Sequence, residues 1–323
     1  MNNLGFLLIQ KYNYDKAMRI VGREVDGDFY PLEIDHKAEE FLRCALEGRK
    51  KVLGSDHLDT LSSLNNLGVL LSIKGDFEWA EQLCRQALMG REKALGSDHP
   101  TTLESVNNLA NLLKIRGDYK GAEELYRRAL ATREKALGVH PDTHISLINL
   151  GDFLWDKANK LKNCGNTNEA EIAFLEALEL YEKSFGRDDP DFYNIVDDLA
   201  SLMIENNDLI AAEKYLRWSL EGWNELYGSD SSEILEYVKK LVTTLKAISK
   251  TAEGVDLLRR YYSVSEQNKV ELRYDLASCE CLNGNTEEAK RLIAEHLKLH
   301  PEIKERALKD SDFEAIKDYI EKL

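Results

Sequence analysis

The sequence predicts an all-α solenoid of about seven helix pairs, on the basis of its composition and an internal repeat. Only 5 Pro and 19 Gly occur among 323 residues, which favours long helices joined by short turns. A Leu-Gly or aromatic-Gly pair recurs at steps of 42, 42, 48 and 42 residues, at Leu53-Gly54, Leu95-Gly96, Leu137-Gly138, Phe185-Gly186 and Tyr227-Gly228. Because self-similarity at a fixed period is the signature of a repeat array, we expect each period to supply one helix pair.

The repeat unit is clearest in the middle of the chain, where residues 60–96 align without gaps on 102–138. Each unit has two apolar stripes at helical spacing, separated by a turn in which Gly75 can adopt a left-handed C-cap. The small residues Gly68 and Ala80 stand where two helices must approach closely. The unit is therefore predicted to be a helix, a tight turn and a second helix.

The spacing inside the unit, Leu-x2-Leu-Gly-x2-Leu and then Ala-x3-Cys-x2-Ala, is typical of a tetratricopeptide repeat, whereas a 42-residue period alone would also suit a HEAT or armadillo array. The stretch NNLANLLKIRGDYKGAEELYRRAL, within residues 105–143, closely resembles the kinesin light chain type of 42-residue tetratricopeptide repeat. The resemblance weakens outward over residues 53–262. It implies a right-handed superhelix whose first helices line a peptide-binding groove, and it does not imply a kinesin.

Later units are less regular. Residues 194–228 and 237–262 keep the apolar positions of helix pairs but lose the glycine turn. Residues 272–301 return to a shorter, 34-residue form, and 304–323 resemble the closing helix that an exposed last repeat needs. We therefore divide the chain into longer repeats at 1–262 and a shorter repeat with a closing helix at 263–323.

Two segments depart from the pattern. Seven extra residues fall around 156–163, and two added turns would lengthen a first helix while returning its apolar face nearly to phase. A protrusion for a partner is the alternative. The first unit is incomplete, because Asn2-Asn3-Leu4-Gly5 aligns with the middle of a first helix, and it is interrupted at 18–35 before a second helix at 38–52. This start suggests a piece of a longer protein or a missed upstream start.

Composition narrows the partner class. Lys plus Arg total 43 against 58 Asp plus Glu, a formal charge of −15 that disfavours direct nucleic-acid binding. The five cysteines are scattered and odd in number, which suits a reducing compartment, and no signal peptide or membrane span is recognisable. We therefore predict a cytoplasmic protein with a protein or peptide partner, no membrane contact and an undefined oligomeric state.

Candidate partner-binding residues follow from the resemblance, which places one face of each first helix inside the superhelix. They are Ser62, Asn65, Asn66, Val69, Glu104, Asn107, Asn108, Asn111, Lys114, Asn149, Asp152, Trp155, Asp197, Asp198, Lys239 and Lys240. Asparagine is a poor helix former, so the repeated Asn pairs need a reason. Two reasons are open: one Asn of each pair (Asn66, Asn108 or Asn149) bonds the backbone of the neighbouring repeat, or Asn65 and Asn107 offer a donor and an acceptor to the backbone of an extended peptide.

The same positions change in charge along the chain. The neutral Asn pairs give way to Asp197-Asp198 and then to Lys239-Lys240. This gradient would orient a ligand with a basic stretch and an acidic end, although solvated surface charges are the simpler interpretation.

Catalysis is not predicted. The sequence has no phosphate-binding glycine loop, no HExxH and no GxSxG, and we predict neither cofactor nor metal. His57, His99 and His140 belong to different repeats and cannot converge on one ion, and Asp56 and Asp98 beside them look like turn or cap residues. The predicted function is a non-enzymatic scaffold or adaptor, and the alternative is a sensor or regulatory module of a larger multidomain protein.

Overall fold

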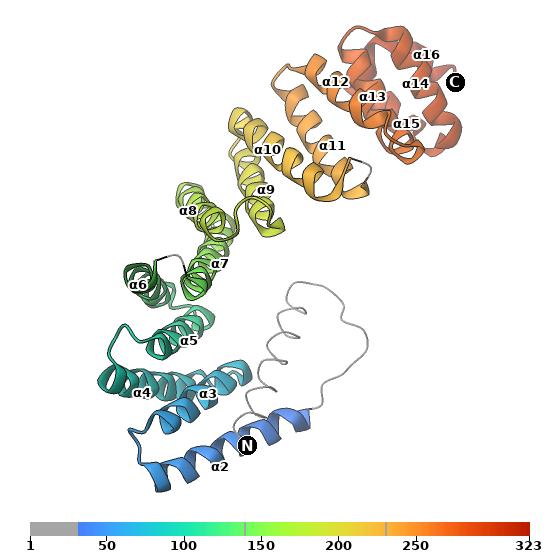
Figure 1. Ribbon diagram of the computed structural model, residues 1–323. Helices are drawn as coiled ribbons and strands as arrows, with labels where there is room; N and C mark the ends of the chain where they lie inside the picture. The colour runs from blue at the N-terminus through green and yellow to red at the C-terminus, as the bar shows by residue number, and fades with distance from the viewer. Residues whose placement is uncertain (1–31, 139, 230) are drawn as a thin grey trace. The chain divides into compact units, whose positions relative to one another are not determined.

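The computed structural model describes residues 32–138, 140–229 and 231–323, which form helices joined by short turns with no strand among them (Figure 1). Two compact units divide inside one helix: the first ends at Phe153 and the second begins at Leu154. The prediction of an all-α array of helix pairs is confirmed. The incomplete first helix and residues 18–31 of the predicted interruption lie outside the described residues.

The first unit contains α2 (Leu32–Leu53), α3 (Leu58–Lys74), α4 (Phe77–Leu95), α5 (Pro100–Arg116), α6 (Tyr119–Leu137) and the first part of α7 (Pro141–Asn163). Helix α3 packs against α4, α4 against α5, and α5 against α6. The turn between α3 and α4 is left-handed at Gly75, whose φ is 90°, and Gly117 repeats this conformation between α5 and α6 with φ 87°. The predicted helix, glycine turn and second helix are therefore confirmed in both of these repeats, α3–α4 and α5–α6.

Close approach within the α3–α4 pair depends on small side chains. A Cβ added to Gly68 would stand 2.6 Å from the Cys84 sulfur and 3.1 Å from the Ala80 carbonyl oxygen, so a larger residue would force the helices apart. Ala80 is itself fully buried.

The recurring histidines cap helices. The Nδ1 atoms of His57 and His99 accept hydrogen bonds from the backbone N–H of Asp59 and Thr101, both at 3.2 Å, and so satisfy donors at the starts of α3 and α5. His140 does the same for Asp142 at 3.1 Å. Asp56 and Asp98 lie in the turns that precede these caps.

The second unit contains the rest of α7 and then α8 (Thr167–Phe185), α9 (Pro190–Glu205), α10 (Leu209–Tyr227), α11 (Ser232–Ala247), α12 (Thr251–Tyr262), α13 (Glu266–Leu282), α14 (Thr286–Leu299), η1 (Pro301–Ile303), α15 (Lys304–Lys309), η2 (Ser311–Ile316) and α16 (Lys317–Glu321). The turns without glycine keep the same conformation, because Asn207 and Ser249 adopt positive φ values of 59° and 63°. The helix pairs predicted at 194–228 and 237–262 are confirmed. The predicted domain boundary after residue 262 lies between the packed helices α12 and α13 and stays a prediction.

The extra residues near 156–163 lengthen a helix. Helix α7 has 23 residues against 17 in α5. Near its end Lys162 pairs with Glu205 of α9 at 3.0 Å, so the added turns pack against the next repeat.

Two predicted boundaries are wrong. Helix α2 begins at Leu32, before the expected residue 38, because the helix continues beyond the part that the repeat alignment covers. The closing segment 304–323 is broken rather than one helix: Asp310 is extended, with ψ 116°, and its carboxylate accepts the Asp312 N–H at 3.0 Å. An Asp side chain that bonds its own backbone in this way ends one helix and starts the next.

Candidate partner-binding site

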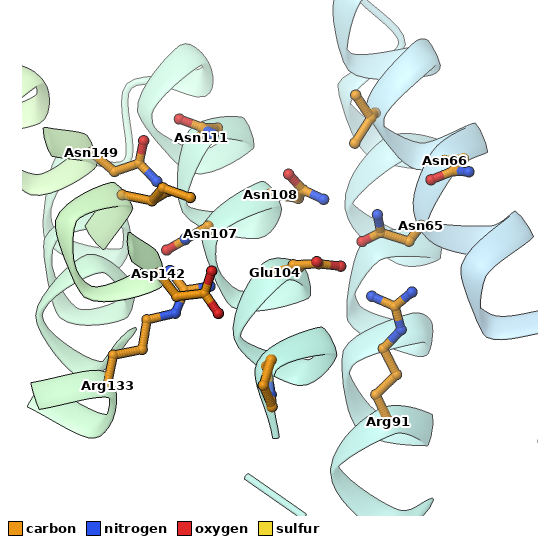
Figure 2. A pocket seen from close by; sticks show the side chains of 13 residues that line it. Asn65, Asn66, Arg91, Glu104, Asn107, Asn108, Asn111, Arg133, Asp142 and Asn149 are labelled. Atoms are coloured by element: carbon orange, nitrogen blue, oxygen red, sulfur yellow. The ribbon is translucent and has the colours of Figure 1, made fainter. Parts of the chain in front are cut away.

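An open cavity of about 390 Å³ lies in the first unit, on α3, α5 and the start of α7 (Figure 2). Eight of the predicted residues line it: Asn65, Asn66, Val69, Glu104, Asn107, Asn108, Asn111 and Asn149. Five further lining residues were not predicted: Arg91, Pro100, Arg133, Asp142 and Ile145. Ser62, Lys114 and Asp152 lie on the same helices but do not line the cavity.

The floor of this cavity is a buried polar layer built around arginine. The Arg91 side chain is only 3% exposed, and it donates to the Thr101 carbonyl oxygen and the Ser105 hydroxyl, both at 2.8 Å. A third bond reaches the Ser62 hydroxyl at 3.0 Å. Arg91 therefore ties α4 to both α3 and α5.

The arrangement repeats in the neighbouring pairs. Arg133 is also 3% exposed and donates to Ser146 at 2.8 Å, and Arg49 donates to Ser63 at 3.0 Å. We did not predict this layer, although the sequence holds its signal: Arg49, Arg91 and Arg133 recur at the 42-residue period. An arginine five residues before each turn glycine is easily taken for a surface charge.

Asn65 and Asn107 are the more buried members of the Asn pairs. They are 5% and 7% exposed, and Asn65 Oδ1 accepts from the Ser105 hydroxyl of the next repeat at 3.2 Å. The Oδ1 of Asn107 is buried without a hydrogen-bond partner among the described residues. Asn65 therefore contacts the next repeat, and the use of Asn65 and Asn107 by a ligand stays a prediction.

The second residue of each pair is the accessible one. Asn66, Asn108 and Asn149 are half-buried and line the cavity, and their side-chain amides have no hydrogen-bond partner within the part of the chain that the structure describes. Asn111, by contrast, accepts a hydrogen bond from the Tyr126 hydroxyl at 2.5 Å. The three amides form a row with one member on each of α3, α5 and α7, here called the amide row.

Charges around the cavity are balanced. Burial lowers the pKa of Arg91, and the opposing effect comes from Glu104, which extends from α5 toward it (Figure 2). Burial likewise lowers the pKa of Arg133, against the carboxylates of Asp142 and Glu104. Arginine stays protonated in proteins, so two guanidinium groups face two carboxylates. The site has a polar surface without a net charge.

The second unit fills the matching positions with tryptophan and carboxylate. The Trp155 indole N–H donates to Asp198 at 2.6 Å, and Asn159 donates to the same oxygen at 3.3 Å. Asp197 accepts from the Trp223 indole at 2.9 Å and from the Ser219 hydroxyl. Both carboxylates are therefore engaged inside the repeats.

Burial also affects the titration of Asp197. Burial raises its pKa above the ordinary 3.8, in spite of hydrogen bonds from Ser219, Trp223 and Tyr237 that act in the opposite direction. The expected use of Asp197-Asp198 as an acidic step for a ligand is thus not supported by their contacts.

The basic step is also partly engaged. Lys239 pairs with Glu271 at 3.2 Å, and Lys240 is exposed with its ammonium group 5.4 Å from the centre of the Tyr237 ring. The charge gradient stays a prediction, with Lys240 as its most accessible member.

The described residues show neither a metal site nor a membrane span. No group of three or more His, Cys, Asp or Glu side chains gathers there in a way that could hold a metal ion. None of the described helices combines the length and the apolar character needed to cross a membrane.

The helix pairs and the polar cavity define a helical-repeat protein. Residues 60–101, 102–145 and 157–191 each match the family model of the tetratricopeptide repeat. These matched residues are therefore tetratricopeptide repeats, as the sequence predicts. Families built from this repeat commonly mediate protein–protein interaction and are generally non-enzymatic.

Similar solved structures include other repeat proteins. The nearly identical tetratricopeptide-like repeats assigned to a Podosopora anserina kinesin light chain share 20% identity, over 69% of this chain and 98% of that one, with a TM-score of 0.47. BtubC (BKLC) from P. vanneervenii shares 19% identity over 70% and 89%, with a TM-score of 0.45. A Parabacteroides merdae tetratricopeptide repeat protein shares 17% over 91% and 92%, with a TM-score of 0.38. No curated protein matches the sequence significantly.

Proposed function

We propose that the protein is a non-enzymatic scaffold that binds a peptide, or an exposed segment of a partner protein, in the cavity of the first unit. The supporting observation is the amide row, in which three half-buried Asn side chains open into one cavity without a described hydrogen-bond partner. Each Asn amide has two donors and one acceptor, so it can pair with both the N–H and the C=O of an extended chain. Such pairing holds a backbone without demanding one sequence.

The arginine layer supports binding by fixing the helices that present the amides. Arg91 links three consecutive helices through hydrogen bonds of 2.8–3.0 Å, and nearly all of its surface is buried. A site whose supporting groups are already ordered loses less conformational freedom when a ligand binds. The cavity is therefore prepared for a ligand before one arrives.

The charge of the chain and the balance of charge in the cavity favour a protein partner. A formal charge of −15 repels a phosphate backbone, so nucleic acid is not part of the proposal. We place the protein in the cytoplasm, without a cofactor. The alternative of a regulatory module within a larger protein stays a prediction.

Site-specific photo-crosslinking tests this function. A photoreactive residue replaces Val69 or Ile145, which line the cavity, or the control residues Trp79 and Ile172, which are 60% and 65% exposed and do not line it. We expect one protein or peptide from the native cell to attach at both cavity positions and not at the controls.

Attachment of that partner at Trp79 or Ile172, but not at Val69 or Ile145, would move the binding face to the outer helices and contradict the proposal. Circular dichroism of each variant confirms that the photoreactive residue leaves the helices intact. Variants that lose helix content are replaced by the neighbouring lining residue Asn111.

A further inference from the structure

The amide row has a regularity that bears on the conformation of its ligand. Asn66, Asn108 and Asn149 are the same residue at equivalent places on α3, α5 and α7, whereas the neighbouring lining positions differ: Val69 corresponds to Asn111, and Glu104 to Ile145. The same side chain in three consecutive repeats is expected to bind a group that every ligand residue has, which is the backbone amide. The neighbouring lining positions, which differ between repeats, are expected to contact the side chains of the ligand.

The spacing of α3 and α5, the helices that carry Asn66 and Asn108, follows from helix packing. Packed helices stand about 8–10 Å apart axis to axis, and α3 and α5 are in contact through the Asn65–Ser105 hydrogen bond of 3.2 Å. A β-strand presents the same side about every 6.6–6.8 Å, and therefore falls out of phase with such a row. A polyproline II segment turns once in three residues, about 9.3 Å, and therefore stays in phase.

We infer that the ligand is an uncharged extended segment in the polyproline II conformation, with one backbone unit in three bonded to the amide row. Its N–H and C=O groups have no partners within the segment, so they are available to the Asn amides. An uncharged segment is favoured because the lining of the cavity contains two basic side chains, Arg91 and Arg133, and two acidic ones, Glu104 and Asp142. This inference rests on the proposed function, since it specifies the ligand of the same site.

The length of the segment follows from where the row ends. The next equivalent position after Asn149 is Asp198, whose carboxylate is already engaged by Trp155 at 2.6 Å and by Asn159 at 3.3 Å. If each of the three Asn side chains of the amide row binds one turn of polyproline II helix, which contains three residues, the bound segment is about nine residues long.

A backbone scan of a selected peptide tests the inference. Random peptides of about twelve residues are selected on the full-length chain, and the best binder is resynthesised with one N-methyl group at each position in turn. We expect losses of affinity of about tenfold at positions three residues apart, and small changes between them, because each methyl group at a bonded position removes one hydrogen bond. Losses at every second residue, or at no regular interval, would overturn the polyproline II assignment.

Variants of the protein separate this inference from the function beneath it. Asn108→Ala should weaken the selected peptide about tenfold, whereas Asn168→Ala, an exposed residue of α8 outside the cavity, should not. If Asn108→Ala weakens binding and the scan shows no three-residue interval, the scaffold function stands and the inference fails. If no peptide binds the unaltered chain, or if Asn108→Ala leaves the affinity unchanged, both the proposed function and this inference fail.

Discussion

The first unit and the second unit solve the same packing problem with different chemistry. Arg91 and Trp223 both stand five residues before a turn glycine, and both donate hydrogen bonds to polar groups on first helices. The guanidinium group of Arg91 binds hydroxyls and a carbonyl and leaves an amide-lined cavity above it. The Trp223 indole is larger and donates a hydrogen bond to Asp197. It also stacks on the rings of Tyr227 and Tyr237, with ring centroids 5.4 and 5.7 Å apart.

The difference shows how one repeat backbone can be open to a ligand in one place and satisfied internally in another. An arginine supplies several donors, so it can hold the helices while the accessible amides stay available. An indole supplies one donor and a large apolar surface, so the carboxylate that it binds is withdrawn from solvent. This difference supports the proposal that a ligand binds in the first unit.

The largest expected effect comes from removing the arginine that holds the amide-lined face. Arg91→Ala leaves the Thr101 carbonyl and the Ser105 hydroxyl without their buried donor and also creates a cavity. We expect the free energy of unfolding to fall by about 3 kcal/mol, measured by urea denaturation followed by circular dichroism.

Arg85→Ala is the matched control. Arg85 lies on the same helix, but its side chain is 53% exposed and, among the described residues, pairs only with Glu81, so its loss should cost less than about 1 kcal/mol. Equal losses for the two variants would show that the arginine layer has no special role in the first unit.

The second effect in size concerns the turns: glycine takes the left-handed conformation at Gly75 and Gly117 of the first unit, whereas two turns of the second unit place Asn207 and Ser249 in that conformation. Gly117 is left-handed, with φ 87°, and Gly117→Ala should destabilise the first unit by about 1–2 kcal/mol. Ser249 adopts a similar conformation, with φ 63°, at the cost of strain, so Ser249→Gly should stabilise the second unit by about 0.5–1 kcal/mol.

Gly48→Ala controls for the general effect of exchanging glycine and alanine. Gly48 lies inside α2 with open space around its Cα, so the added methyl group should stabilise by about 0.5–1 kcal/mol. A destabilising Ser249→Gly in the same urea experiments would mean that the Ser249 side chain matters more than its backbone conformation.

Much of this fold was predictable because the same sequence pattern occurs in several consecutive repeats. The turn glycines, the apolar stripes and the small residues Gly68 and Ala80 follow from local rules that act within one unit. The turns at Asn207 and Ser249 were harder to predict, because these residues adopt the left-handed conformation without the glycine that usually marks it. The break at Asp310 depends on a single side-chain hydrogen bond at 3.0 Å, which periodicity does not reveal.

The cavity was predictable in position but not in detail. Helical spacing brought both Asn65 and Asn66 to the inner side, yet it could not decide which one faces the next helix, because neighbouring residues differ by about 100° around the axis. That choice depends on Ser105, 40 residues away, which bonds Asn65. The role of Asp197 was missed for the same reason, since its donors Ser219 and Trp223 come from another helix.

The smallest effect concerns the carboxylate that distinguishes the second unit. Burial raises the pKa of Asp197 above 3.8, so the native state holds this proton more tightly than the unfolded state does. Its contribution is most favourable below pH 3.8 and declines as the pH rises through the raised value. The free energy of unfolding of the natural chain, minus that of Asp197→Asn, should therefore fall across this window in urea titrations followed by tryptophan fluorescence. Tyr237→Phe, which removes a hydrogen bond that lowers this pKa, should extend the decline to higher pH.

The contradicting outcome is a difference in the free energy of unfolding, between the natural chain and Asp197→Asn, that does not change with pH. It would show that Asp197 is as well solvated as the open face of the first unit. The contrast between the two units would then lie in their aromatic packing alone.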